Sequence, residues 1–219
     1  MIQYWVIHML KNMTIFIDLG SINSYLAIKP SRELMDEFGL SVEWLPINGI
    51  VKRAAQRKPV IAENDDLAEI KLRRMQAKLR DEVRELERNA KLLNLPKIDA
   101  TKVYNSRWSH IGLLYLNYCE IDPLGYIEQV FNWRFQKGRD LDTQDSICSL
   151  LADLNIEKEG FLAFAAESEM QLDILQNNTI QSGVFDSPAY QFDGQNYQGR
   201  AHLPLLRWRL SGANGTAPV

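Results

Sequence analysis

Residues 21–24 (SINS) form the first segment whose residue types and position suit chemistry. They follow an apolar run at 14–19 and begin a helical pattern at 22–38. The free N–H groups at a helix N-terminus stabilise an anion. A hydroxyl placed there can donate a hydrogen bond to a thiolate that belongs to a bound molecule. The other interpretation is that Ser21 only caps the helix. Both place Ser21 at the helix start, and they differ in whether a thiolate binds there.

The cysteine content excludes dithiol chemistry. The chain has two cysteines, Cys119 and Cys148, and no Cys-x-x-Cys pair. Serine cannot exchange disulfides, so a protein disulfide oxidoreductase is excluded. The wide spacing also argues against a zinc site or a disulfide framework. Two isolated cysteines are typical of a reducing compartment, so we expect a cytoplasmic protein.

Ser187-Pro188 is the second segment of interest, and it lies at the start of a predicted strand. A cis proline here would turn the backbone N–H and C=O of Ser187 toward the loop at Ser21. Those two groups could then pair with the backbone of a bound peptide, as an added strand does. A Ser-Pro dipeptide alone is a weak turn signal, and its position next to a strand gives it weight.

The three histidines give no metal-ligand spacing such as HExxH, so we expect no metal. His202 could act as a general acid or base, or it could simply face solvent at a helix start. His110 lies one turn beyond Arg107 and could face the same cleft, and a core or surface position fits the sequence equally well. Trp108 and Tyr104 could line an apolar substrate pocket beside this turn.

The order of predicted elements brings the two serine segments together. Strands at 14–19 and 41–46 flank the helix at 22–38, which makes a βαβ unit with a parallel strand pair. Strands at 187–192 and 195–198 are joined by Asp193-Gly194, a strong hairpin signal. Each half is an incomplete sheet, so the two must pair. The helices expected in addition cover 65–93, 106–119, 123–137, 143–153, 157–166, 168–177 and 202–210.

These elements predict an α/β fold, a thioredoxin-like domain with an all-helical insertion. The predicted boundaries are a thioredoxin-like domain at 14–48 and 183–210, a helical insertion at 49–182, an N-terminal extension at 1–13 and a flexible tail at 211–219. We expect Pro30 to kink or split the first helix and Gly39 to end it. Met13 directly precedes the first strand, so it is a candidate start of translation, and an extra edge strand before it is the other interpretation.

Composition narrows the classes of partner. The chain of 219 residues has 25 Lys and Arg against 28 Asp and Glu, for a net charge of −3. This balance supplies no basic field for nucleic acid. The mixed charges of 65–93 predict a solvated amphipathic helix. No apolar stretch reaches the roughly 18 residues of a membrane span. We therefore expect neither a nucleic-acid nor a membrane partner.

Three motifs in order resemble the family of 2-hydroxychromene-2-carboxylate isomerases and kappa-class glutathione transferases. FIDLGSINSYLA at 16–27 is similar to the family's Asp-x-x-Ser-Pro-[Tyr/Phe]-Ser-[Trp/Tyr]-Leu-[Ala/Gly]. VYNSRWSHIGLLY at 103–115 is similar to the start of a helix in the family's inserted domain. The segment 183–210 is similar to the family's C-terminal pattern, in which Gly-Val-x-Gly-[Val/Ser]-Pro-Thr is followed by Asp-Gly-x-x-x-x-Gly. The resemblance implies a DsbA-like thioredoxin fold, glutathione as cofactor and a homodimer.

The resemblance also implies roles for single residues. Ser21 would contact the glutathione thiol as the catalytic serine. Lys52, Asn105 and Arg107 would orient the substrate, with Trp108 beside them. The positions that would hold glutathione are Ser187, Pro188, Gly199, Arg200 and His202.

Several positions depart from the family pattern. Ile22 and Asn23 stand where the family has Pro and an aromatic residue. The family's Gly-[Ser/Asn]-Asp-Arg is replaced by residues 199–202 (GRAH), and the missing Asp normally meets the γ-glutamyl ammonium. Arg200 would repel that ammonium and attract carboxylates.

Two hypotheses for function follow. In the first, a glutathione thiolate adds reversibly to an unsaturated carbon of a small aromatic or hydroxy-acid substrate, the product bond rotates, and glutathione leaves. Conjugation and peroxide reduction are less favoured versions of this enzyme. In the second, a divergent member of the fold has lost glutathione and acts as a binding or interaction protein.

Overall fold

The computed structural model describes residues 12–48, 66–95, 99 and 102–218 of the chain. The predicted substrate residue Lys52 and residues 1–11 of the predicted extension at 1–13 lie outside these residues, whereas Asn12 and Met13 belong to the first strand and not to an extension. None of the described helices is both long enough and apolar enough to cross a membrane. Across the same residues, no group of three or more His, Cys, Asp or Glu side chains could hold a metal ion.

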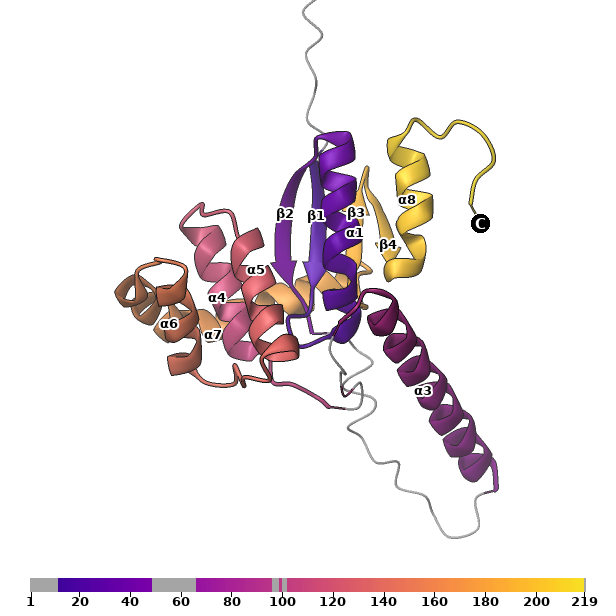
Figure 1. Cartoon of the computed structure of the whole chain (residues 1–219), viewed down its shortest axis with the longest axis horizontal. Helices are drawn as coiled ribbons and strands as arrows, with labels where there is room; N and C mark the ends of the chain where they lie inside the picture. The colour runs from indigo at the N-terminus through magenta and orange to yellow at the C-terminus, as the bar shows by residue number, and fades with distance from the viewer. Residues whose placement is uncertain (1–11, 49–65, 96–98, 100–101, 219) are drawn as a thin grey trace, which may run out of the picture.

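A four-stranded sheet joins the two ends of the described chain (Figure 1). β1 (Asn12–Ile17) pairs in parallel with β2 (Ser41–Pro46) and antiparallel with β3 (Ala189–Phe192). β3 continues into β4 (Gln195–Gln198) through a tight hairpin. The strand order is β2-β1-β3-β4, so the predicted pairing of the two half-sheets is confirmed.

The central position of β1 explains its almost wholly apolar sequence. Met13, Ile15 and Ile17 are buried in the main core. Phe16 points into a second cluster with Ile47, Val184 and Ala189. A strand buried on both faces has little room for the polar alternation of an edge strand.

α1 (Ile22–Phe38) follows β1 after a short loop. Ser21 caps its start, and Gly39 ends it in the left-handed conformation with φ 57°, where a side chain would be strained. The helix is not split at Pro30, contrary to one of the outcomes expected there. Leu26 and Leu34 are buried on either side of Pro30, and this packing holds the two halves in one helix.

The remaining helices form the insertion and the C-terminal cap of the sheet. A long helix, α7, replaces the two predicted at 157–166 and 168–177. Phe161, Ala165, Ser168 and Leu172 form one continuous buried stripe, and no Gly or Pro interrupts it. The helices are α3 (Asp66–Leu92), α4 (Arg107–Tyr118), α5 (Leu124–Phe131) with a π-helical turn η1 (Asn132–Gln136), α6 (Gln144–Asp153), α7 (Lys158–Gln181), a 3-10 turn η2 (Arg200–His202) and α8 (Leu203–Leu210).

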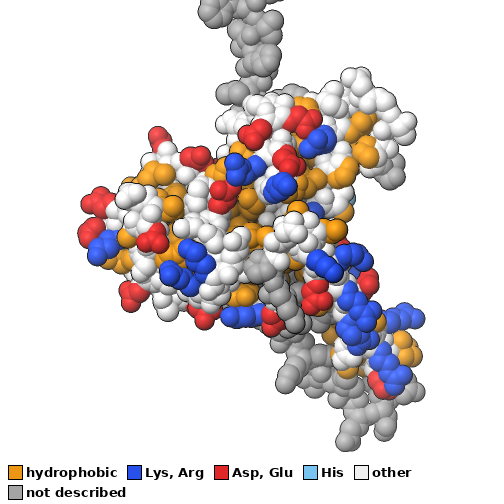
Figure 2. Space-filling view, viewed as in Figure 1, with side chains coloured by type: hydrophobic (Ala, Val, Ile, Leu, Met, Phe, Trp, Pro, Cys, Tyr) orange, Lys and Arg blue, Asp and Glu red, His pale blue; other side chains and the backbone are white. Residues whose placement is uncertain are grey.

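In Figure 1, α1 lies over the sheet with α8 beside it, and α4, α5 and α6 gather on the side of β2. α3 extends away from this body, and Figure 2 shows basic and acidic side chains mixed along it. This is the solvated helix that the sequence predicted. The division into a domain at 14–48 and 183–210 and an insertion at 49–182 stays a prediction.

Candidate functional site

Ser21 occupies the loop between β1 and α1, with extended backbone angles of φ −102° and ψ 127°. Its Oγ accepts a hydrogen bond from the backbone N–H of Ser24 at 3.5 Å, so the predicted cap is present. Among the described residues, the Ser21 hydroxyl makes no other hydrogen bond, and the residue is half-buried. Its proton can therefore be donated outward, at the positive end of the α1 dipole.

Ser187 lies directly beneath this loop, and its peptide bond to Pro188 is cis. The Ser187 side chain is 3% exposed. Its Oγ accepts a hydrogen bond from the Asp18 N–H at 2.7 Å and shares another with Ser24 Oγ at 2.6 Å. One buried hydroxyl thus joins the end of β1, the first turn of α1 and the segment that precedes β3.

The backbone groups of Ser187 already have partners within the chain. Its N–H donates to Asp186 Oδ1 at 2.8 Å. Its carbonyl oxygen accepts from Asn23 Nδ2 at 3.2 Å. A peptide ligand that pairs with both backbone groups of Ser187 must therefore compete with Asp186 and Asn23.

Five side chains form a buried polar cluster under the Ser21 loop: Asp18, Ser24, Ser106, His110 and Ser187. Each is at most 5% exposed. Asp18 Oδ1 accepts from the Gly20 N–H at 2.8 Å and from Ser106 Oγ at 3.0 Å. His110 Nε2 accepts from the Leu19 N–H at 3.1 Å and lies 3.6 Å from Asp18 Oδ1. The cluster fixes the loop through its backbone N–H groups.

Only part of this cluster is predictable from the sequence. Asp18, Ser24 and Ser106 lie within the motifs without an assigned role, and the sequence fits a cleft, core or surface position for His110 equally well. The structure buries His110 completely. Ser106 and His110 are four residues apart at the start of α4, so they share one helix face. That spacing of two polar side chains on one face was the available signal.

Arg200 reaches the same loop from the other side. Its Nε donates to Asn23 Oδ1 at 2.6 Å, and its Nη2 lies 3.5 Å from Glu85 Oε1 on α3. Burial lowers the pKa of Arg200, and the Glu85 carboxylate opposes that shift. Gly199, with φ 76°, donates its N–H to the carbonyl of Pro188 at 2.7 Å. Arg200 is thereby brought next to the first turn of α1.

Ser187 has no hydrogen bond to His202 or to the predicted substrate residues that the structure describes. His202 is exposed, and its Nδ1 contacts the Gln198 carbonyl, which matches the solvent-facing interpretation. Arg107 is bound by Asp173 and Glu169 of α7, both at 3.1 Å. The hydrogen bond with Asp173 raises the pKa of Arg107. Its charge is therefore neutralised within the chain.

Asn105 and Trp108 flank the residues that contact the loop. Asn105 is exposed, and its Oδ1 accepts from the Arg107 N–H at 3.1 Å. Trp108 is half-buried and packs against the core. The structure thus brings this turn against the Ser21 loop, but through Ser106 and His110, which alternate with the predicted residues.

A groove of about 880 Å³ runs between α1, the end of α3 and α5. It begins near Tyr25, one turn after Ser21. The Tyr25 ring stacks on Phe131 and Phe135, with centroids 5.3 Å and 5.2 Å away. Its hydroxyl accepts from Gln136 Nε2 at 2.7 Å. The residues that line this groove include Tyr25 and Phe131, and Asn105, Arg107 and Trp108 are absent from its described walls.

Comparisons with known proteins bear on the fold. No protein-family model matches the chain. No curated protein matches it either. Among solved structures, a 2-hydroxychromene-2-carboxylate isomerase superposes with a TM-score of 0.66 and 24% identity, over 92% of this chain and 95% of that one.

Two further solved structures are similar. The cytosolic disulfide reductase DsbM from Pseudomonas aeruginosa, solved with glutathione, has a TM-score of 0.59 and 18% identity over 92% of this chain and 98% of that one. A probable DsbA oxidoreductase from Streptomyces coelicolor has a TM-score of 0.64 and 13% identity over 95% and 93%. The chain therefore has a DsbA-like thioredoxin fold, as its sequence predicted.

Proposed function

We propose that the chain is a glutathione-dependent enzyme, an isomerase of the 2-hydroxychromene-2-carboxylate type or a related transferase. The observation that carries the proposal is the Ser21 hydroxyl. It accepts its capping bond from Ser24 and keeps its proton for a ligand at the N-terminus of α1. Support also comes from similar structures named as an isomerase and as a disulfide reductase with glutathione.

Catalysis in this proposal needs no thiol from the protein. The Ser21 O–H donates to the sulfur of bound glutathione, and the α1 dipole favours the thiolate. Bound glutathione would supply a nucleophilic sulfur that adds reversibly to an unsaturated carbon of the substrate, so that the carbon-carbon bond could rotate before the C–S bond breaks and the double bond re-forms without an oxidant or reductant. The contribution of the chain would be to hold that sulfur, through the Ser21 hydroxyl, at the N-terminus of α1.

The substrate would be a small aromatic or hydroxy-acid molecule. The groove beside Tyr25 supports an aromatic substrate because its apolar wall begins one turn from Ser21. Asn105, Arg107 and Trp108 do not line the described walls of this groove, so they and Lys52, the proposed orienting residues, would act on a part of the substrate that lies outside it. Arg107 would have to exchange Asp173 or Glu169 for a substrate carboxylate to take that role.

The proposal includes a cytoplasmic homodimer. Cys119 and Cys148 are both free thiols, which supports a reducing compartment. The homodimer follows from the family resemblance, and light scattering on the purified chain checks it.

Calorimetric titration of reduced glutathione tests the proposed function. Saturable binding is expected, weakened about tenfold by Ser21→Ala because a hydrogen bond to a charged sulfur is lost. Thr143→Ala is the matched control, since Thr143 caps α6 with the same kind of side-chain bond. Both variants lose a helix cap, and only the first should lose affinity. If glutathione does not bind at millimolar concentration, the proposed function is wrong.

One observation favours the alternative of a binding or interaction protein that has lost glutathione. Both backbone groups of Ser187 are occupied, by Asp186 and Asn23. If these contacts are permanent, no tripeptide can pair with Ser187. This alternative predicts that glutathione neither binds nor raises the melting temperature, whereas a ligand of the native state must raise it.

A further inference from the structure

Arg200 and Glu85 form an ion pair at the edge of the Ser21 loop. Arg200 Nη2 lies 3.5 Å from Glu85 Oε1. Arg200 Nε is bonded to Asn23 Oδ1 at 2.6 Å, and Asn23 Nδ2 is bonded to the Ser187 carbonyl at 3.2 Å. Two hydrogen bonds thus connect the pair to the backbone segment where the proposed thiol ligand would lie.

The side chains of Arg200 and Glu85 differ in their exposure to solvent. The Arg200 side chain is 20% exposed, while that of Glu85 is 54% exposed. Within the described part of the chain, Arg200 Nη1 makes no hydrogen bond, so its N–H groups can still donate to a ligand. A guanidinium that is held at Nε and still has donors to spare suits a carboxylate ligand.

A neutral pair discriminates between kinds of ligand. A lone carboxylate is attracted by Arg200 and repelled by Glu85, so the two effects partly cancel. A lone ammonium meets the opposite cancellation. An α-amino-acid group carries both charges on one carbon, and each can face its own partner. The pair therefore complements a zwitterion better than either single charge.

We propose that Arg200 and Glu85 bind the α-amino-acid end of the thiol ligand, with its carboxylate on Arg200 and its ammonium on Glu85. The proposal rests on the proposed glutathione-dependent function. The sequence alone predicts that Arg200 repels the γ-glutamyl ammonium. The structure offsets that repulsion, because the carboxylate of Glu85 on α3 forms an ion pair with Arg200 and can attract the ammonium. Glu85 could not be assigned from the sequence, since it lies more than a hundred residues before Arg200.

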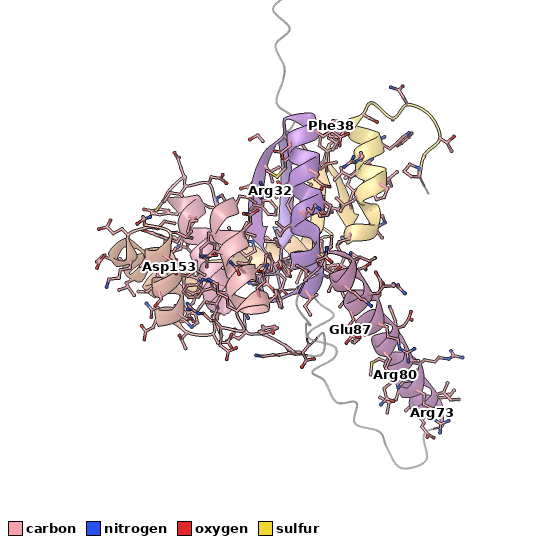
Figure 3. All side chains as sticks on the ribbon, viewed as in Figure 1. Arg32, Phe38, Arg73, Arg80, Glu87 and Asp153 are labelled. Atoms are coloured by element: carbon pink, nitrogen blue, oxygen red, sulfur yellow. The ribbon has the colours of Figure 1, made fainter. Side chains whose placement is uncertain are left out.

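The test compares two ligands by calorimetric titration: reduced glutathione and N-glutaryl-cysteinyl-glycine, which lacks only the amino group. The wild-type chain should bind glutathione about tenfold more tightly. Glu85→Gln should remove that preference by weakening glutathione alone. Arg200→Gln should weaken both ligands, because both keep the carboxylate. Glu87→Gln, on the same helix (Figure 3), is the control and should change neither affinity.

The outcomes separate this inference from the function it rests on. If both thiols bind equally to the wild-type chain, or if Glu85→Gln weakens both to the same extent, the zwitterion pair is wrong while the thiol site stands. If neither thiol binds, the proposed function is wrong and the pair has no ligand. Far-UV circular dichroism of each variant verifies that α3 is retained.

Discussion

The floor and the rim of the candidate site are built differently. The floor is the buried polar cluster, in which Asp18, Ser106 and His110 hold the loop before Ser21 through short hydrogen bonds without solvent. The rim carries Arg200 with Glu85 and Arg107 with Asp173, in ion pairs that solvent reaches. Buried polar groups are costly to leave without partners, whereas exposed pairs contribute little to stability. The floor therefore determines geometry, and the rim is free to select a ligand.

The largest effect should come from Asp18→Ala in the floor. The substitution leaves the buried Gly20 N–H without its acceptor and leaves the Ser106 hydroxyl only the longer bond to Asn48 Oδ1 at 3.4 Å. We expect the free energy of unfolding to fall by about 3 kcal/mol, measured by urea denaturation. Asp173→Ala on the rim is the comparison, with a loss of about 0.5 kcal/mol or less. Equal losses at the two positions would contradict the division into floor and rim.

The two described histidines allow a second comparison of a buried with an exposed position. His110→Ala removes the acceptor of the Leu19 N–H and leaves a cavity, so we expect a loss of about 2 kcal/mol in unfolding free energy. His202→Ala, at an exposed position, should change it by about 0.5 kcal/mol or less. Thermal unfolding of both variants measures the difference. A large loss for His202→Ala would show that an exposed position beside Arg200 also supports the fold.

The smallest effect concerns the boundary between floor and rim, where Asp186 accepts from the Ser187 N–H. If glutathione pairs with that N–H, Asp186→Ala should strengthen binding about fivefold, since the ligand no longer competes for the donor. Asp153→Ala, on α6 (Figure 3), is the control. An unchanged affinity in Asp186→Ala would mean that the ligand does not use the Ser187 N–H.

Local signals in the sequence predicted most of the fold. The caps at Ser21 and Gly39 and the Asp193-Gly194 turn depend on a few neighbouring residues, and the structure has all of them. The error at α7 has a similar origin. The residues at the junction of the two predicted helices, 166–168, include no Gly or Pro, and the buried stripe from Phe161 to Leu172 runs through that junction, so the helix continues.

The candidate site depended on contacts that no local signal reveals. Ser106 meets Asp18 across 88 positions, and Ser187 meets it across 169. Glu85 meets Arg200 across a comparable gap. Motif resemblance located Ser21 and Ser187, because their positions follow from strand and helix starts. Their buried partners follow from how α4 packs on the sheet, which residue types alone do not specify.

The pairing of β1 with β3 also imposes an order on synthesis. Ile15 has its antiparallel partner in Tyr190, so the middle of the sheet stays open until β3 has left the ribosome. The helices between them are complete earlier and can fold first. A nascent chain that stops before Ser187 contains Ser21, its helix and the other floor residues, but it lacks the Ser187 hydroxyl that joins the end of β1 to the first turn of α1. Ribosomal stalling or premature termination in this interval therefore yields a chain that presents the serine above an incomplete floor.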